Sequence, residues 1–466
     1  MSSASAFPTK RFFVSMLTRD IDLGDSIMDL LDNCVDGILR QLKQTPRVQD
    51  SKLPYDGFWA QIIANRDTFS IMDNCGGIPR DIAVKSAFRL GRLETDRDTD
   101  IATVGMYGIG MKRALFKLGS QTTVNSRHDG ESYSVEISSD WINNDDLWDL
   151  PLTDTPNSLQ ADGTQIIVSQ LHEPIAHQFD ETESTFVTDL KENISSFYSL
   201  ILQKGFHISV NGEELAPVGL GILVPADFTL DAVPPYAYRG TFDGVDIQLF
   251  IGFYRRLATE PEIDDEQNIP RKSDNAGWTV ICNDRVVLYR DKSPITGWGS
   301  DNVPKYHPQF IAIAGVVMFY SDQPLNLPLN TTKRGLDTSS PIYWHTRRFM
   351  LEGLKKFTDF TYHWKGQEDD TNTRFQVSVQ RNATEVIQSI PATSWKHLRG
   401  SEGERFVPDL PRPQPREAKR RISFMRLQEE IALLGEHYFT DRAAKPAEIG
   451  NQCFDEALER AREVRP

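Results

Sequence analysis

Apolar residues recur at helical spacing between Asp25 and Leu39. Ile27, Leu30, Leu31, Cys34 and Ile38 fall on one side of a helix, which predicts a buried face. Asp29, Asn33 and Asp36 follow one another at i, i+4 and i+7 on another side. Two carboxylates and a carboxamide in a row suit magnesium binding and water activation, but acidic residues on an amphipathic helix also commonly face solvent. This segment alone leaves both interpretations open.

A second pattern is a strand that ends in an acidic residue and a glycine turn. The segment TFSIMDNCGGIP, from Thr68 to Pro79, predicts a strand ending at Asp73, a turn through two glycines and a helix opened by Pro79. An Asp at a strand end can accept a hydrogen bond from an amine. The glycines permit a ligand ring to lie close to the backbone, with Ile78 as an apolar wall. Taken alone, the segment is more often an ordinary turn.

A third pattern is a glycine-rich loop before a helix. In VGMYGIGMKRALFKL, Gly105, Gly108 and Gly110 lead into a helix that carries Lys112. Backbone N–H groups at a helix start form a cradle for anionic phosphates. The spacing differs from that of the Walker motif, and a lone glycine triplet is weak evidence. Further along, Thr164 begins an apolar strand, where its hydroxyl can bridge to an adenine-binding Asp or its water.

The rest of the chain changes pattern twice. Four prolines between 217 and 235 interrupt regular structure and predict a domain junction. Strands are then expected at 245–253, 278–282, 286–289 and 310–320, with a turn at Asn283-Asp284 and a polar loop near 259–275. After Asp337 the pattern is helical through Trp364, followed by a charged spacer at 366–374 and a proline-rich linker near 407–415 before a last helical region.

Length and charge limit the alternatives. A chain of 466 residues predicts two or three domains, and we expect three. The formal charge of −15 argues against non-specific coating of nucleic acid, although local basic patches are compatible with it. Residues 1–10 are polar and lack the apolar stretch of a signal peptide, and the longest apolar run, 311–320, is too short for a membrane span, so we expect no export or anchoring. Scattered cysteines at 34, 75, 282 and 453 predict free thiols in a reducing cytoplasm.

Together, in this order and at these intervals, the four segments resemble the N-box, the two glycine boxes and the GT motif of GHKL ATPases (gyrase, heat-shock chaperone, histidine kinase, MutL). The resemblance implies an ATP-binding α/β sandwich with a lid, here at about 89–104. It implies that Asn33 binds Mg²⁺, Asp73 recognises adenine and Gly77 lets adenine approach. The residues it implies around ATP are Asn33, Asp36, Asp73, Gly77, Ile78, Gly105, Met106, Tyr107, Gly108, Ile109, Gly110, Met111, Lys112 and Thr164.

Two positions depart from the family pattern. Asp29 stands where gyrase, MutL and the heat-shock chaperones have the Glu that activates water, and Cys75 replaces the first glycine of DxGxG. An Asp would be ionised at neutral pH and could act as a base. Its side chain is one methylene shorter, and a general base must come within about 2.6–3.2 Å of the attacking water. We therefore expect ATP binding, and hydrolysis that is slow if it occurs.

The resemblance extends to a second domain. The segment LPLNTTKRGLD, from Leu327 to Asp337, resembles the transducer loop whose lysine reaches the γ-phosphate, which gives Lys333 a catalytic role. A solvated loop lysine is the alternative, and Arg334 is a substitute candidate. The hairpin GWTVICNDRVVLYR resembles that of MORC-type ATPases, including bacterial relatives, with Arg285 at the matching arginine.

The expected architecture has three parts. Residues 1–215 form the GHKL domain (Bergerat fold), 236–340 a ribosomal-S5-like α/β transducer domain, and 341–466 a mainly helical C-terminal region. In that region, a basic stretch beginning at Arg412 interleaves with apolar residues up to Leu427. Such a helix either touches nucleic acid or a partner, or has a solvated face.

Three functions are weighed. The leading hypothesis is an HSP90-like or MORC-like ATPase switch: ATP and Mg²⁺ close the lid, the chain forms a homodimer, and contacts with a protein partner or DNA change, in a role that includes bacterial anti-phage defence. The second is a scaffold that binds ATP or ADP without hydrolysis. Protein histidine kinase activity is disfavoured, because no His-bearing dimerisation helix precedes the ATP-binding segment. The client, the resting oligomer and the organism do not follow from the sequence.

Overall fold

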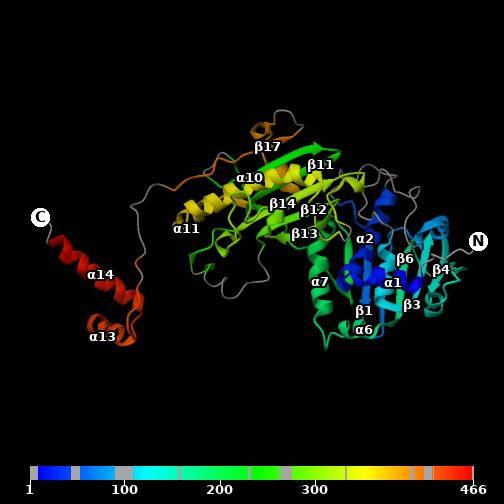
Figure 1. The fold of residues 1–466 in the computed structure, drawn as a ribbon. Helices are drawn as coiled ribbons and strands as arrows, with labels where there is room; N and C mark the ends of the chain where they lie inside the picture. Colours follow the sequence, from blue (N-terminus) through cyan, green and yellow to red (C-terminus); the bar gives the residue numbers. More distant parts are fainter. Residues whose placement is uncertain are drawn as a thin grey trace, which may run out of the picture. The chain divides into compact units, whose positions relative to one another are not determined.

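The computed structural model of the chain forms two compact units, residues 1–413 and 414–466. It describes residues 9–42, 53–89, 109–155, 159–228, 232–260, 262–263, 275–330, 333–398, 403–413, 422 and 424–463, without the side chains of 368 and 369. The first unit contains two large sheets (Figure 1). The mixture of sheets and helices confirms the predicted α/β class.

The described part of the first sheet has eight strands in the order β5-β4-β3-β6-β2-β1-β7-β8. Its neighbours are antiparallel except β1 and β7, which run parallel. The strands are β1 (Trp59–Ala64), β2 (Thr68–Asp73), β3 (Gly119–His128), β4 (Glu131–Ile137), β5 (Leu152–Asp154), β6 (Gly163–Leu171), β7 (His207–Val210) and β8 (Glu213–Glu214).

Helices pack on this sheet through one apolar core. The core residues of α2 and α4 include Ile27, Leu31 and Leu115, which are almost fully buried beside Ile62 and Val168 of the strands. The helices of this region are α1 (Lys10–Arg19), α2 (Leu23–Leu42), α3 (Arg80–Ile82), the π-helical turn η2 (Ala83–Ala87), α4 (Gly110–Leu118), α5 (Ser139–Asn143), α6 (Glu173–Gln178), α7 (Phe186–Phe197) and α8 (Ser199–Gln203). The packing brings α2 beside α4, which sets up the candidate site.

The second sheet follows the order β13-β12-β14-β11-β10-β17-β16 among the described residues. Its strands are β10 (Tyr236–Phe242), β11 (Val245–Phe253), β12 (Gly277–Cys282), β13 (Arg285–Asp291), β14 (Ile313–Tyr320), β16 (Lys396–His397) and β17 (Glu404–Phe406). The pairing of β12 with β14 is parallel and brings together segments that are distant in the sequence. The short turns η4 (Pro294–Thr296), η5 (Pro308–Phe310) and η6 (Pro324–Asn326) lie in its connections.

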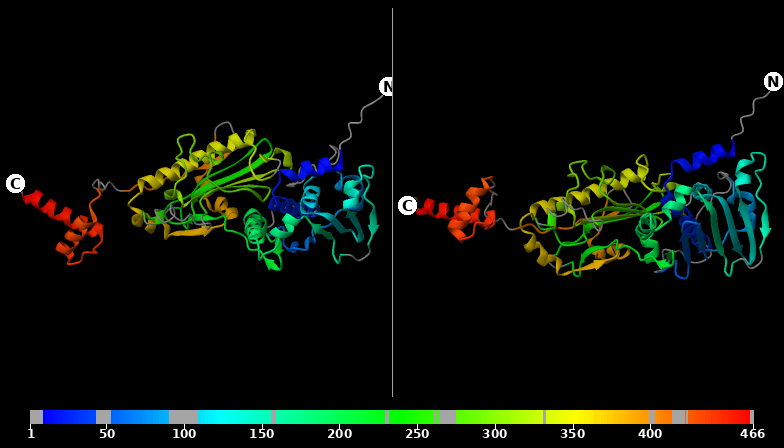
Figure 2. Two further views of the ribbon diagram at one scale, coloured as in Figure 1. Left: turned by 60° about the horizontal axis from the view of Figure 1, so that its bottom comes forward. Right: turned by 90° about the horizontal axis from the view of Figure 1, so that it is seen from below.

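Both faces of the second sheet are covered. Helix α10 (Pro341–His363) runs along one face, across β10 and β11 (Figures 1 and 2). The opposite face packs against α12 (Ala383–Ser389) and against β9 (Ile222–Pro225), which pairs with β15 (Ser378–Arg381). The strands are therefore apolar on both sides, as in Leu249 and Phe250 of β11, which lie in the two different cores. This explains why the sequence there lacks alternation.

Several expected elements of the second sheet are confirmed. The predicted strand 245–253 is β11, and the hairpin turns through Asn283 and Asp284, which both have positive φ, at 45° and 68°. Asn and Asp tolerate this left-handed conformation, which two-residue hairpins require. The helix expected after Asp337 is α10.

Two expectations were wrong. The proline-rich junction contains the strand β9, which ends at Pro225, because a proline needs no amide partner at a strand end. The charged spacer contains α11 (Glu368–Phe375). The region after 341 also includes short strands among its helices, two of which extend the second sheet. The strands β9, β15, β16 and β17 have only two to four residues each, too few for an alternating pattern, so the sequence did not indicate them.

The unit from residue 414 onward is a helical hairpin in its described part, α13 (Gln428–Phe439) and α14 (Pro446–Glu463). It buries little: Ile449 is 3% exposed, whereas Leu433 and Phe454 are 65% and 51% exposed. In the portions of the chain that the structure describes, no helix has the length and apolar character needed to cross a bilayer.

Candidate functional site

Helix α2 carries the acidic residues of the site. It spans Leu23–Leu42, and the predicted apolar face is buried in the first core. Asp29 and Asp36 are also buried, at 5% and 1% exposure, and only Asn33 of the three predicted residues is exposed. The expectation of one acidic side projecting away from the core was thus wrong for the two carboxylates, because other elements cover that side of α2.

Asp73 ends β2, as predicted, and its carboxylate is held from several directions. Its Oδ1 accepts hydrogen bonds from the backbone N–H groups of Cys75, at 2.7 Å, and Thr164, at 3.3 Å. Its Oδ2 accepts a hydrogen bond from the Cys34 thiol at 3.4 Å. Burial raises the pKa of Asp73 to about 6, against the lowering effect of these hydrogen bonds. The structure therefore joins the N-box helix, the first glycine box and the GT strand at one carboxylate.

The glycines near Asp73 allow neighbouring backbone segments to approach one another closely. Gly77 has φ 69°, and a Cβ atom there would lie 2.0 Å from the carbonyl oxygen of Arg127. Gly163 is equally tight, since a Cβ would lie 2.0 Å from the Asp73 carbonyl oxygen. The close approach of the β2, β3 and β6 backbones thus requires glycine at both positions. Ile78 is fixed next to them, because its N–H donates to Ser126 and its carbonyl accepts from Tyr133.

The predicted phosphate-binding loop is described only at its end. Gly105, Met106, Tyr107 and Gly108, and the expected lid from residue 90 onward, lie outside the described residues. Helix α4 begins at Gly110 after Ile109, and a Cβ at Gly110 would lie 3.3 Å from the Cβ of Asp29. The helix start therefore faces α2. Met111 packs partly buried against the first core, and the Lys112 ammonium donates to the Ala87 carbonyl at 2.8 Å.

Asp29 is paired with cations from two directions. Its Oδ2 forms a salt bridge with Arg113 of α4, and its Oδ1 lies 3.8 Å from the Lys333 ammonium. Sequence analysis missed Arg113, although its place in the first turn of the helix after the glycines was an available signal. A carboxylate held in this way would have to give up part of its pairing before it could take a proton from water.

This geometry agrees with the comparison to protein families. Residues 22–173 match the model for histidine kinase-, DNA gyrase B-, and HSP90-like ATPases. This part of the chain is a GHKL ATPase domain. The same chain has no match among curated proteins.

The second sheet contributes to the GHKL domain through Lys333. The residue has φ 56° in a tight loop, where its N–H donates to the Asn330 carbonyl at 3.1 Å. Its ammonium is 2.9 Å from Oδ2 of Asp32 on α2, a buried pairing that excludes the solvated-loop alternative. Arg334 pairs with Asp25, two turns before Asp32 on α2, at 2.5 Å, and lies over the Phe197 ring.

Asp32 is the second residue that sequence analysis missed. Besides Lys333, it accepts hydrogen bonds from Tyr198 at 2.7 Å and from Arg285 at 2.9 Å. Arg285, which the sequence singled out only by resemblance, is 2% exposed and also lies over the Tyr198 ring. Asp25, Asp29 and Asp32 are spaced by four and three residues, so they share one side of α2, and the predicted Asp29 and Asp36 lie on that same side.

No group of three or more His, Cys, Asp or Glu side chains in the described ranges is arranged to hold a metal. A GHKL domain binds Mg²⁺ together with ATP, and the exposed amide of Asn33 offers one oxygen for it. Phosphate oxygens and water would have to supply most of the remaining ligands. The residues present fit a nucleotide-bound magnesium ion rather than a free-standing metal site.

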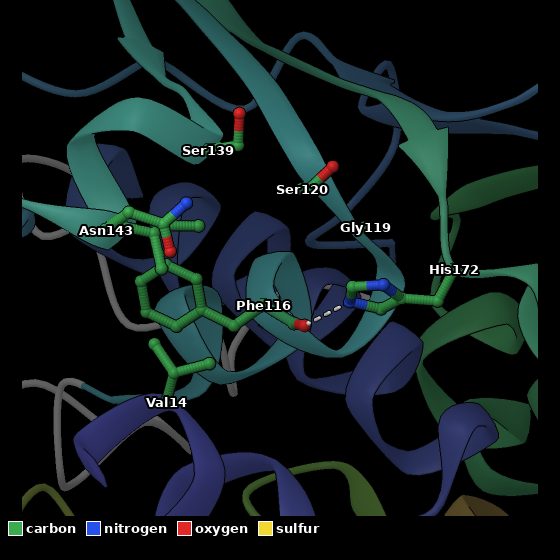
Figure 3. A pocket seen from close by; sticks show the side chains of 8 residues that line it. Val14, Phe116, Gly119, Ser120, Ser139, Asn143 and His172 are labelled. Atoms are coloured by element: carbon green, nitrogen blue, oxygen red, sulfur yellow. Dashed lines mark hydrogen bonds between the residues drawn. The ribbon is translucent and has the colours of Figure 1, made fainter. Parts of the chain in front are cut away.

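A separate cavity of about 190 Å³ lies elsewhere on this domain (Figure 3). Its lining is mostly apolar, and it includes Val14 of α1, Phe116 of α4 and His172, whose Nε2 lies 3.2 Å from the Phe116 carbonyl. None of the predicted site residues lines it. The cavity is therefore distinct from the candidate ATP site.

Proposed function

We propose that the chain is an ATP-binding molecular switch that hydrolyses ATP slowly. The observation that carries the proposal is the convergence at Asp73, where the N-box helix, the first glycine box and the GT strand share one carboxylate. Its Oδ1 is occupied by two backbone donors, whereas Oδ2 accepts only from the Cys34 thiol and has a second lone pair to accept a hydrogen bond from the exocyclic amine of adenine. The start of α4 would face the phosphates, as helix N-termini do for anions.

Within this proposal each candidate residue has a task. Asn33 would hold Mg²⁺, Asp29 would act as the base, and Lys333 would place positive charge at the γ-phosphate. Arg113 adds a second cation beside Asp29. Because this pairing restrains the base, we expect turnover to be slow and ATP binding to be the robust property.

Calorimetry tests the binding step. Wild-type protein should take up ATP and ADP in the presence of Mg²⁺, and Asp73→Asn should remove uptake of both nucleotides. Asp180→Asn is a matched control, because Asp180 is a distant carboxylate whose partners are Thr182 and Arg66. An absence of heat with the wild-type chain would refute the assignment.

The second candidate function is a scaffold that binds ATP without hydrolysis. The pairing of Asp29 with both Arg113 and Lys333 favours it, since a fully neutralised base takes up a proton poorly. Phosphate release separates the two. Steady release that disappears in Asp29→Asn excludes the scaffold, whereas tight ATP binding without release excludes the ATPase.

The switch itself requires that ATP changes assembly. We propose a homodimer that forms with MgATP and changes contacts with a protein partner or with DNA. Sedimentation with and without MgATP tests this, with Asn33→Ala as the comparison. A monomer in every condition would refute dimerisation. For the MORC-like, anti-phage role, phage plating on cells with and without the gene is decisive.

A further inference from the structure

Asp32 is a buried carboxylate with three different donors where the GHKL domain meets the second sheet. Its Oδ1 accepts from Tyr198 and Arg285, at 2.7 and 2.9 Å, and its Oδ2 accepts from the Lys333 ammonium at 2.9 Å. Its side chain is 3% exposed. Each oxygen therefore has strong donors, and the carboxylate has little freedom to rotate.

Lys333 is located by two carboxylates of the same helix. Its Nζ lies 2.9 Å from Asp32 and 3.8 Å from Asp29, and these acids are three residues apart on α2. A lysine side chain has four rotatable bonds and loses much conformational entropy when it is fixed. A buried carboxylate that two other side chains already hold in place, as Tyr198 and Arg285 hold Asp32, can fix the ammonium in one position.

The anchors of Asp32 come from different parts of the fold. Tyr198 precedes α8, and its hydroxyl bonds Asp32 and lies 2.7 Å from the Met28 carbonyl. Arg285 begins β13 and is further held by the Phe197 carbonyl at 3.0 Å. Asp32 is thus held by Tyr198 of the first domain and by Arg285 of the second sheet, and it in turn holds the Lys333 ammonium in place.

We propose that Asp32 is a positioning residue that fixes the Lys333 ammonium beside Asp29, so that Lys333 distinguishes ATP from ADP through the γ-phosphate. The proposal rests on the proposed function, because it assumes ATP at this site. It assigns Asp32 no contact with the nucleotide. Its whole effect passes through Lys333.

The main test is a comparison of ATP and ADP affinities by calorimetry with Mg²⁺. Asp32→Asn keeps the size of the side chain but loses its charge, so Lys333 is no longer held. We expect the preference for ATP over ADP to fall about 10-fold, as for loss of one charge-assisted hydrogen bond, while ADP affinity stays close to wild type. Where turnover is measurable, kcat should fall about 100-fold and KM should rise about 10-fold, because slow chemistry makes KM equal to the dissociation constant of ATP.

A double-mutant cycle tests whether Asp32 acts through Lys333. Lys333→Met should lower the ATP preference by itself, and Asp32→Asn should then add nothing further. Additive effects of the two changes would overturn the proposal. Asp32→Asn that binds ATP and ADP in the wild-type ratio would also overturn it.

The pH dependence of the ATP preference tests the charge of Asp32 itself, because a loss of packing alone would not make this preference depend on pH. Burial lowers the pKa of Lys333, but Asp32 and then Asp29 and Asp36 raise it, and the balance lies above its ordinary value. Arg113, Arg285, Arg334, Tyr198 and Asp25 also face this cluster. Without the Asp32 charge the ammonium loses its proton more easily. The ATP preference of Asp32→Asn should therefore weaken further as pH rises from 7 to about 9.

Asp284 provides a matched structural control. It is buried at the same contact between sheets and accepts from Tyr55 at 2.8 Å and from Lys204 at 2.6 Å, but Lys333 is not among these partners. Asp284→Asn should leave the ATP preference unchanged. If it lowers the preference as much as Asp32→Asn does, general loosening of the contact explains the effect and the proposal fails.

Folding and the underlying function are checked separately. If circular dichroism shows that Asp32→Asn is unfolded, Tyr198→Phe is used, which removes one bond to Asp32 and keeps its charge. That variant should lose about 3-fold in ATP preference, and an unchanged value would overturn the proposal. A wild-type chain that binds neither nucleotide refutes the proposed function, whereas normal wild-type binding with unaffected variants refutes only the role of Asp32.

Discussion

The buried carboxylate of Asp73 lowers the free energy of unfolding at neutral pH by an amount that can be measured. Burial raises its pKa from 3.8 to about 6 in the folded chain. In the unfolded chain the carboxyl group would titrate near the ordinary value, so between about pH 4 and pH 6 the folded chain holds a proton that the unfolded chain has lost. The contribution of the protonated carboxyl group is fully present below about pH 4 and is lost as pH rises through about 6.

The size of the effect follows from the difference between the two pKa values. A difference of roughly 2 pKa units corresponds to about 3 kcal/mol at neutral pH. Asp73→Asn has the same shape and does not ionise, so we expect its free energy of unfolding at pH 7.5 to exceed that of wild type by up to about 3 kcal/mol. At pH 4 the advantage should largely disappear.

The same substitution should abolish adenine binding. The two backbone N–H groups at Oδ1 require an acceptor there, so the amide oxygen of the substituted side chain would take that position and its NH₂ group would take the place of Oδ2. An NH₂ group cannot accept a hydrogen bond from the adenine amine. Asp73→Asn is therefore expected to be more stable and inactive in ATP uptake.

Urea unfolding at pH 4 and pH 7.5, with calorimetry for ATP, checks these expectations. Asp180→Asn is a control of opposite sign, because hydrogen bonds from Thr182 lower the pKa of Asp180, and removal of its charge should reduce stability at neutral pH. The reasoning is refuted if Asp73→Asn is less stable than wild type at pH 7.5, or if its advantage does not change with pH.

Three further predictions concern other parts of the site. Asn33→Ala should lower ATP affinity in Mg²⁺ about 10-fold or more in calorimetry, without changing the unfolding midpoint, because its side chain is exposed. Arg113→Ala should lower the free energy of unfolding in urea by about 2–3 kcal/mol, because it leaves the buried Asp29 carboxylate without its salt-bridge partner. The loss should be much smaller when Asp29→Asn is already present, because that change has already removed the same salt bridge. Gly77→Ala should lower the thermal midpoint far more than Gly130→Ala, because both have positive φ but only Gly77 would meet backbone, at 2.0 Å. Similar losses for the two glycine variants would contradict this explanation.

Local patterns predicted the elements that carry the site well. The periodicity from Asp25 to Leu39 predicted helix α2, and the strand ending at Asp73 is β2 with its glycine turn. The turn at Asn283-Asp284 was also predictable, because few residues adopt positive φ there. In each case the determining interaction lies within a few residues along the chain.

The pairing of charges was not predictable in the same way. Asp32 meets Lys333 across 301 residues of sequence and Arg285 across 253, and Asp29 meets Arg113 across 84. From the sequence of the helix alone, nothing distinguishes Asp32 from the other acidic residues of α2. Its importance comes from which cations the folding of two sheets brings against it.

The sequence by itself determined the family of the first domain, the helices and strands that bear its motifs, and the chemistry of the candidate residues, because motif spacing and local backbone preference are written into neighbouring positions. Only the tertiary structure decided which carboxylates of α2 are buried, that Gly77 is required by the Arg127 backbone, and that Asp32 receives Lys333 and Arg285. Burial and ion pairing depend on distances between segments far apart in the chain, and those distances exist only once the sheets have packed.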